Sequence, residues 1–209
     1  MNEEFEAVYT GVSKFDAELV KKLSYTRYNT YMWKSKLLLY CASALMIICA
    51  LAFIKEKAIS LCLLALGCVV LTNVNSTPNS QTKQILRELK GNYPLINYFF
   101  GENGFKYTGA VDKLSDYGEI DRLVEDEDFF YIFLGNMSGH VIDKKTVMKE
   151  DSCEPEAFKQ FLSKKTGISW TKPLSRKNLT LQNIMERFNS EKKKYITEDY
   201  GERLPYNHR

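Results

Sequence analysis

Hydrophobic and polar positions divide the chain into two apolar runs and a polar remainder. The runs cover residues 37–54 and 58–74, and neither contains a charged side chain. At 1.5 Å per residue they form helices of about 27 and 26 Å, close to the ~30 Å hydrocarbon core of a bilayer. A helix in a soluble core usually carries a polar stripe, and the first run offers only Ser43. The pattern therefore predicts a transmembrane helical hairpin.

The short connection between the runs fixes how the hairpin is arranged. Only Lys55, Glu56 and Lys57 separate the two helices, so the helices must be antiparallel neighbours. Eight Lys and Arg residues flank the outer ends of the hairpin, against two in the connection. The positive-inside rule then places both termini in the cytoplasm. We expect a multi-pass protein of the cell (cytoplasmic) membrane.

Small residues recur along the second run at steps of three and four. Such a stripe lets helix backbones approach closely within lipid. Packing inside the hairpin is the favoured interpretation, and a dimerisation face that makes a homo-oligomer is the alternative. Neither run contains an acidic, basic or histidine residue, which argues against an ion pathway. The stripe consists of Ala58, Cys62, Ala65, Cys68 and Thr72.

The segments on either side of the hairpin have helical patterns of their own. Before it, Phe5, Ala7 and Tyr9 alternate with polar residues as in a strand, and a capping box at Ser13 predicts an amphipathic helix. After it, the polar residues 76–80 break the helix and precede a short helix over 81–90.

The rest of the chain has the pattern of short strands followed by one helix. A turn at 101–104 joins the first two strands, and the helix begins at Pro155 and stops at Gly167. This layout predicts an antiparallel barrel or sandwich closed by a C-terminal helix, as in a pleckstrin-homology-like (PH-like) domain. The strands are expected at 95–100, 105–108, 111–114, 119–125, 129–134 and 139–143.

The whole is thus an α+β membrane protein in which a transmembrane hairpin precedes a PH-like domain. The expected parts are an N-terminal strand and juxtamembrane helix (1–36), the hairpin (37–74, with helices 37–54 and 58–74), a connecting helix (75–94), the PH-like domain (95–168) and a basic tail (169–209).

Several short motifs resemble those of the YcxB-like family of bacterial membrane proteins. They run from Tyr98-Phe99-Phe100 to Gly104-Phe105, then through Tyr117 and Ile120, the acidic turn and aromatic strand at 125–132, and His140-Val141-Ile142-Asp143-Lys144. Asp143 departs from the family pattern, as does the lack of an aromatic residue soon after Lys144. The resemblance covers about residues 5–166. It implies two spans and a C-terminal PH-like domain, and it implies no settled activity.

Charge is unevenly distributed, although the net charge is only +3. Residues 102–128 carry nine acidic side chains against three basic ones. They lack the spacing and the glycine of an EF-hand loop, so a solvated acidic face is expected rather than a cation site. The acidic hairpin at 101–104 also predicts that no phosphoinositide binds there.

Motifs that carry catalysis are scarce. Ser138, His140 and Asp143 are close in sequence, but a catalytic triad needs them to converge in space, and a strand histidine is the favoured interpretation. Cys49 and Cys62 fall at similar depth, so a disulfide is an alternative to two apolar fillers. We expect no catalytic, cofactor-binding or metal-binding residues, no cofactor and no enzyme.

The tail is basic and includes Lys192-Lys193-Lys194. Leu179, Ile184, Met185 and Phe188 give it the pattern of a short amphipathic helix, for which lipid binding, partner docking and a solvated tail remain open. A stacking platform for nucleic acid is absent. We therefore expect a non-catalytic protein-interaction or regulatory module with a protein partner, no nucleic acid and no small-molecule substrate. The alternative is an accessory subunit of a membrane complex, such as an exporter, that docks through the hairpin.

Overall fold

The structure is a computed structural model that describes residues 5–109, 113–173, 180, 182, 184 and 185. The chain divides into two compact units, 1–173 and 174–209, and the fold below belongs to the first. In the second, the backbone N–H of Ile184 donates to the carbonyl of Thr180 at 3.0 Å, which is one helical turn. The predicted tail helix otherwise falls mostly on residues outside this description, among them Leu179 and Phe188.

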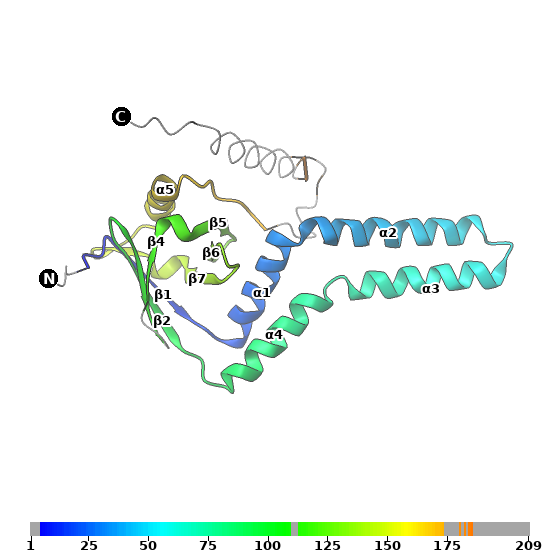
Figure 1. Cartoon of the computed structure of the whole chain (residues 1–209), viewed down its shortest axis with the longest axis horizontal. Coiled ribbons are helices and arrows are strands. Elements are labelled where there is room, and N and C mark those ends of the chain that lie inside the picture. Colours follow the sequence, from blue (N-terminus) through cyan, green and yellow to red (C-terminus); the bar gives the residue numbers. More distant parts are fainter. Residues whose placement is uncertain (1–4, 110–112, 174–179, 181, 183, 186–209) are drawn as a thin grey trace, which may run out of the picture. The chain divides into compact units, whose positions relative to one another are not determined.

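The two apolar runs are helices that lie side by side and antiparallel (Figure 1). Helix α2 is Trp33–Ala52 and helix α3 is Lys57–Asn73. The helical segments Trp33–Ala52 and Lys57–Leu89 are long and apolar enough to cross a membrane. The predicted pair of helices is therefore confirmed, and the first begins four residues earlier than the apolar run itself.

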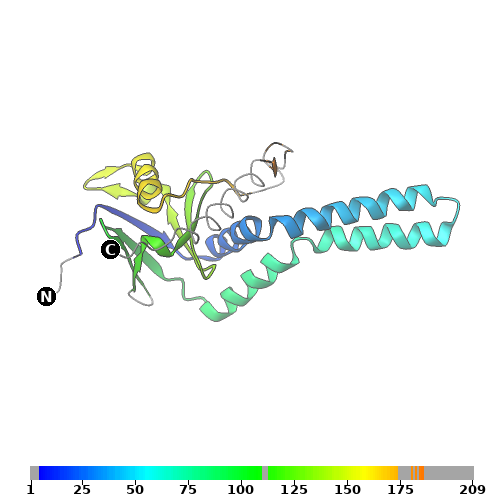
Figure 2. The ribbon, with the colours of Figure 1, turned by 45° about the horizontal axis from the view of Figure 1, so that its top comes forward.

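A second helix pair continues from the hairpin. Helix α1 is Ala17–Tyr31 and helix α4 is Ser76–Leu89, and the two pack against each other (Figure 2). The predicted capping box at Ser13 is wrong, because Ser13 belongs to a strand and its hydroxyl bonds the carbonyl of Val141. Asp16 caps α1 instead, accepting from the backbone N–H of Leu19 at 2.9 Å.

The larger sheet has six strands in the order β4-β3-β2-β1-β8-β9. Its third and fourth strands, β2 and β1, come from opposite sides of the hairpin in the chain, and they pair antiparallel from Tyr9↔Phe100 to Lys14↔Leu95. Helices α1 to α4 are therefore an insertion between two paired strands. The strands are β1 (Tyr9–Lys14), β2 (Leu95–Phe100), β3 (Gly104–Thr108), β4 (Lys113–Asp116), β8 (Met148–Lys149) and β9 (Ser152–Cys153).

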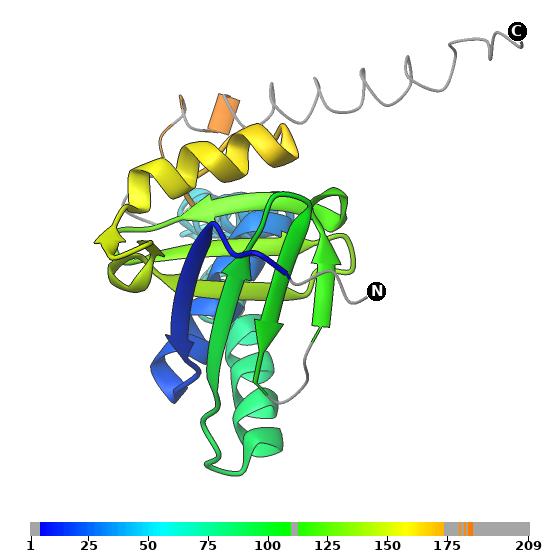
Figure 3. The same ribbon diagram turned by 90° about the vertical axis from the view of Figure 1, so that its left-hand side faces the viewer.

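The smaller sheet has three antiparallel strands, β5 (Ile120–Glu125), β6 (Phe129–Leu134) and β7 (Gly139–Asp143). Figure 3 shows its strands running across those of the larger sheet. Short 3-10 turns at Tyr117–Glu119 (η1) and Lys144–Thr146 (η2) connect the sheets. No ladder closes the two sheets into a barrel among the described residues, so of the two predicted forms, barrel or sandwich, the barrel is wrong. The α+β class with antiparallel sheets is confirmed.

One hydrophobic core lies between the sheets and helix α5 (Pro155–Thr166). Phe158 of α5 packs edge-on against Phe100 of the larger sheet, with ring centroids 4.8 Å apart. It also contacts Phe130 of the smaller sheet at 5.5 Å. Pro155 begins α5, and Gly167 ends it in a left-handed conformation (φ 70°), as predicted. Helix α5 therefore holds the two sheets together.

The smaller sheet is covered on both faces. Its other face carries Tyr131, Phe133 and Val141, which pack under Leu19 and Leu23 of α1. A strand that is buried on both faces has a continuous apolar sequence, and this accounts for the unbroken run of hydrophobic residues in β6. The helix that leads into the hairpin is thus fixed on the domain by its own small core.

Candidate functional site

The contact between α2 and α3 is built around Gly67. A Cβ atom at this position would lie 3.1 Å from the Ile47 side chain and 3.3 Å from the Ser43 carbonyl oxygen. The Ser43 hydroxyl donates to the Gly67 carbonyl at 2.9 Å, and the Ser60 hydroxyl donates to the Ala50 carbonyl at 2.8 Å. The helices therefore meet through a glycine and two hydroxyls, as closely packed helices in lipid do.

The small-residue stripe of α3 does not take part in this contact. All five of its members are exposed, whereas Gly67 is buried against α2. The favoured interpretation of the stripe, packing inside the hairpin, is therefore wrong. The physical reason is the helical phase, because Ser60 and Gly67 are seven residues apart and share one face, which leaves the stripe on the opposite face of α3.

Large apolar side chains cover the outer surface of the hairpin. Leu45 of α2 is 62% exposed and Leu61 of α3 is 68% exposed. Core helices of soluble proteins bury such side chains. In the most apolar stretches of Trp33–Ala52 and Lys57–Leu89, by contrast, only 17% and 11% of the residues are buried. A contiguous apolar surface of this kind marks a membrane or protein contact.

Hydrogen bonds tie the helices together where the hairpin joins the domain. The Tyr28 hydroxyl of α1 donates to the Val74 carbonyl beyond the end of α3 at 3.0 Å. The Tyr31 hydroxyl, at the end of α1, donates to Asp121 of β5 at 2.8 Å. Helix α1 is therefore bonded both to the end of the hairpin and to the smaller sheet.

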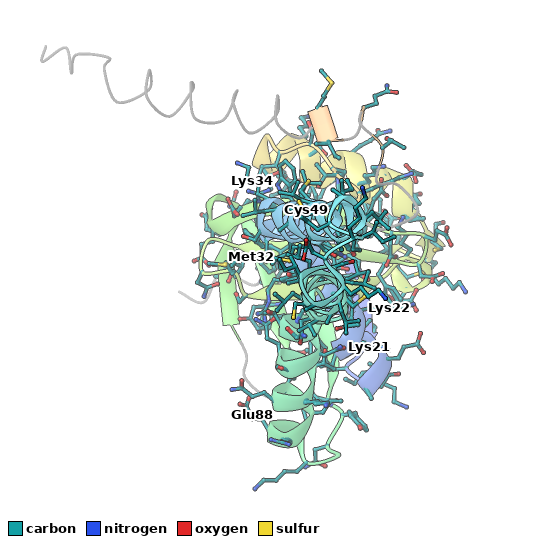
Figure 4. All side chains as sticks on the ribbon, turned by 90° about the vertical axis from the view of Figure 1, so that its right-hand side faces the viewer. Lys21, Lys22, Met32, Lys34, Cys49 and Glu88 are labelled. Carbon is teal, nitrogen blue, oxygen red and sulfur yellow. The ribbon has the colours of Figure 1, made fainter. Side chains whose placement is uncertain are left out.

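Basic side chains lie on α1 and at the start of α2, and Figure 4 labels three of them, Lys21, Lys22 and Lys34. Lys21 and Lys34 are exposed. Lys36, which lies one turn into α2, is buried, and its ammonium donates to Asn29 of α1 at 2.7 Å. Its ammonium therefore points to the preceding helix rather than outward to the headgroups.

The acidic stretch that begins at residue 125 is partly buried rather than a fully solvated face. Glu125 is buried, with one carboxylate oxygen 3.0 Å from the ammonium of Lys144 and the other bonded to Lys159 of α5. Burial by itself would raise the pKa of Glu125, but the hydrogen bonds from Lys159 and Lys144 lower that pKa below its ordinary value. This cluster joins β5, η2 and α5.

Asp126 organises the turn between β5 and β6. One of its carboxylate oxygens accepts the backbone N–H groups of Asp128 and Phe129 at 2.9 and 2.7 Å. The other accepts the Tyr131 hydroxyl at 2.7 Å, and burial together with this bond raises the pKa of Tyr131 above its ordinary value. The prediction of solvated acids therefore fails for Glu125 and Asp126, while Glu127 and Asp128 are exposed. Sequence alone could not show which lysines would reach Glu125.

His140 lies in an aromatic cluster beneath the larger sheet. Its ring centroid is 4.4 Å from that of Tyr107 and 5.7 Å from that of Phe105. Ser138 is exposed, and the Asp143 carboxylate accepts the backbone N–H of Lys145 at 2.9 Å. His140 and Asp143 are three residues apart on one strand, so they point to opposite faces. The structure does not bring the three together as a triad.

All five cysteines lie in the described part of the chain and are free, so the alternative of a Cys49–Cys62 disulfide is wrong. Cys153, in β9, is exposed. Over the residues described, no group of three or more His, Cys, Asp or Glu side chains could hold a metal ion.

An open groove of about 850 Å³ lies beside the turn between β2 and β3. Sequence reasoning recognised this turn as acidic but missed the groove, because its walls come from segments far apart in the chain. They are the residues before β1, the β2–β3 turn, β3, β4 and η1. The charged lining consists of Glu6, Glu102, Asp116, Glu119 and Lys106, and the apolar lining includes Phe5, Val8 and Leu114.

Comparison with known proteins identifies part of the domain. Residues 100–162 match the family model described as YcxB-like protein. The resemblance found in the sequence is therefore confirmed over this region, which runs from the end of β2 into α5. Searches of curated proteins and of solved structures give no match. Within the matched region, Glu125 at the start of the acidic turn forms an ion pair with Lys144, the lysine that follows β7.

Proposed function

We propose that this chain is an integral membrane protein whose α2–α3 hairpin anchors a non-catalytic protein-interaction or regulatory domain at the cytoplasmic face. The observation that carries the proposal is the outward-facing apolar surface of the hairpin, on a chain whose domain buries most of its large apolar side chains in a core. Exposing that surface to water would cost free energy, whereas the hydrocarbon core of a bilayer would solvate it.

A PH-like arrangement of the domain belongs to the same proposal. Two antiparallel sheets share one core, and the helix that follows them, α5, packs against both. This is the layout that the YcxB-like resemblance implies, in an open rather than a closed form. Such domains present sheet edges and loop clefts to partners, and peptide binding at an edge needs no catalytic group.

The non-catalytic role is supported by what the polar side chains of the domain do. Glu125 joins three elements through two lysines, and Asp126 holds a turn together. His140 packs among aromatic rings. These groups are engaged in the fold, where each one serves stability or loop geometry.

The proposed cytoplasmic orientation is supported by the charges at the two ends of the hairpin. Basic residues concentrate on α1, the start of α2 and α4, and only Lys55 and Lys57 lie at the tip. A reporter that is active only in the cytoplasm is fused after Arg209 and, separately, inserted at Glu56. We expect activity from the first fusion and none from the second. The reverse pattern would overturn the orientation.

A second candidate function is favoured by the exposure of the small-residue stripe on α3. Because this stripe points away from α2, another transmembrane helix could pack closely on it, as expected of an accessory subunit of a membrane complex. Crosslinking the full chain in membranes separates the two candidates. We replace Ala65 with Leu to block the stripe, with the lipid-facing exchange Leu64→Ala as the matched control. If the captured partner is lost only with A65L, the hairpin is the docking element.

A further inference from the structure

We propose that the groove beside the β2–β3 turn binds an extended, basic segment of a protein partner, which adds as a strand along the free edge of β4. This inference rests on the proposed function and names the chemistry of its partner. It is carried by three features of the groove: its charge, its open sheet edge and its apolar anchor points.

The charge of the groove is strongly one-sided. Its lining holds four carboxylates and a single lysine, Lys106. Glu102 already pairs with Lys165 of α5, which lowers the pKa of Glu102 and keeps it ionised. Glu6, Asp116 and Glu119 have no ion pair with any residue that the structure describes. The carboxylates of Glu6 and Glu119, and the Asp116 oxygen that does not accept the Gly118 backbone N–H, therefore remain available to Lys or Arg side chains of a ligand.

The edge of the larger sheet runs along this groove. β4 pairs with β3 from Gly104↔Asp116 to Tyr107↔Lys113, and over the described ranges no strand pairs with its other side. An unpaired edge offers backbone N–H and C=O groups to an added strand. Ser115, in the wall of the groove, is 2% exposed, and its hydroxyl has no hydrogen-bond partner in this structure. A buried hydroxyl of this kind is satisfied when a ligand supplies a partner.

Apolar side chains provide anchor points between the acids. Leu114, in the middle of β4, is 63% exposed, and Phe5 is exposed at the other side of the groove. Gly101 lets the N-terminal segment approach, since a Cβ there would lie 2.8 Å from the Glu6 carbonyl oxygen and 3.0 Å from the Phe5 ring. Leu114 and Asp116 are two residues apart on β4 and therefore lie on one face of the sheet. A strand with alternating basic and aliphatic side chains fits this surface, because its basic side chains would all lie on that face, with their methylene stems on Leu114 and their charges at the acids.

The same charges disfavour the other occupants. Anionic lipid and nucleic acid would face three uncompensated carboxylates, and a second copy of the chain would bring the same acids to the edge. A basic peptide instead gains attraction and is steered toward the groove at low ionic strength.

The test uses the full chain in nanodiscs of neutral phosphatidylcholine, so that lipid charge does not compete. The probe is a fluorescent ten-residue peptide of alternating Lys and Val, and the matched peptide alternates Glu and Val. The groove variant is Glu6→Gln with Glu119→Gln. The matched control removes two exposed charges elsewhere, Glu127→Gln with Glu156→Gln.

We expect the Lys/Val peptide to bind, and the groove variant to weaken its dissociation constant by about three- to tenfold, as two exposed charge pairs would. The control variant should bind as the native chain does. A Lys/Val peptide methylated on alternate backbone nitrogens should bind more weakly, because it cannot form the strand ladder. Equal binding by the groove variant, equal loss in the control variant, or tight binding of the Glu/Val peptide would overturn the inference.

The failure of this inference is distinguishable from the failure of the proposed function. If the reporter fusions place the domain in the cytoplasm but the Lys/Val peptide does not bind the groove, the proposed membrane-anchored domain is supported and the proposed basic partner is contradicted. If the two fusions give the reverse pattern of activity, the proposed function is contradicted, whether or not the peptides bind in nanodiscs.

Discussion

The hairpin and the domain use the same apolar side chains in opposite ways. Leu61 of α3 is 68% exposed, whereas Leu162 of α5 is fully buried. In water the first arrangement is costly and the second is the normal one. The contrast is the one expected under the proposed function, in which one chain is adapted to two solvents, with the hairpin in lipid and the domain in water.

Polar contacts follow the same division. Between α2 and α3, hydroxyls bond backbone carbonyls, as Ser43 does with Gly67. In the domain, ionised groups are partly buried, as Glu125 is with Lys144 and Lys159. An ion pair inside a bilayer is far more costly than a hydroxyl that bonds a nearby carbonyl. The difference is the one expected if only the hairpin is surrounded by hydrocarbon.

The largest expected effect comes from removing the same apolar group in each region. Leu162→Ala should destabilise the domain by about 2–5 kcal/mol, because it leaves a cavity between α5 and the sheets. Leu61→Ala removes the same atoms from an exposed position and should leave unfolding of the domain unchanged. Denaturant unfolding of the full chain in detergent, followed by tryptophan fluorescence, measures both. Equal losses of stability in the two variants would contradict the proposed difference between the hairpin and the domain.

A charge placed on the exposed surface separates lipid from water. Leu45→Lys should hinder membrane insertion by about 2.5–3.5 kcal/mol, the cost of a lysine near the centre of a spanning helix. Leu114→Lys, at a position of nearly equal exposure in β4, should leave insertion unchanged. The fraction of each variant that resists extraction from membranes gives the comparison. Full insertion of L45K would show that the hairpin surface faces water.

The buried acid of the domain gives a dependence on pH. Glu125→Gln should destabilise the domain by about 1–3 kcal/mol, because Lys144 and Lys159 lose their shared partner. The pKa of Glu125 is lowered in the folded chain. Its contribution is therefore present above the ordinary glutamate pKa of about 4.3 and is lost as the pH falls through the folded pKa. Unfolding measured from neutral to acid pH should show a steeper decline in the native chain than in E125Q.

The smallest expected effect lies inside the hairpin. Ser43→Ala removes one hydrogen bond to Gly67 and should weaken the helix pair by about 0.6 kcal/mol. Single-molecule unfolding in bicelles can resolve a change of this size. Cys41→Ala, on an exposed position of the same helix, is the matched control and should have no effect. A loss from C41A as large as that from S43A would contradict the assigned contact face.

Local patterns predicted the elements well, because their causes lie close together in sequence. The uncharged runs specified α2 and α3, and three strands have the predicted bounds: β2, β6 and β7. Pro155 and Gly167 marked the start and the end of α5. Periodicity, proline and glycine act on neighbouring residues, so no tertiary information was needed.

The errors concern contacts between distant residues. The stripe on α3 was assigned to the hairpin because its residues are small, but the helical phase of Gly67 decided the contact face. Glu125 has the sequence pattern of a solvated acid, but α5, which is distant in the chain, places Lys159 in contact with its carboxylate. The groove depends on the pairing of β1 with β2 across the inserted helices, which no local pattern records.

Cysteine accessibility tests the central claim, that the hairpin spans the membrane and the domain lies in the cytoplasm. Cys62 and Cys153 are both exposed and free, one on α3 and the other on β9. Variants that retain a single cysteine are treated with a membrane-impermeant maleimide in inside-out vesicles. We predict rapid labelling of Cys153 and labelling of Cys62 only after detergent is added. Equally rapid labelling of Cys62 in intact vesicles would contradict the account.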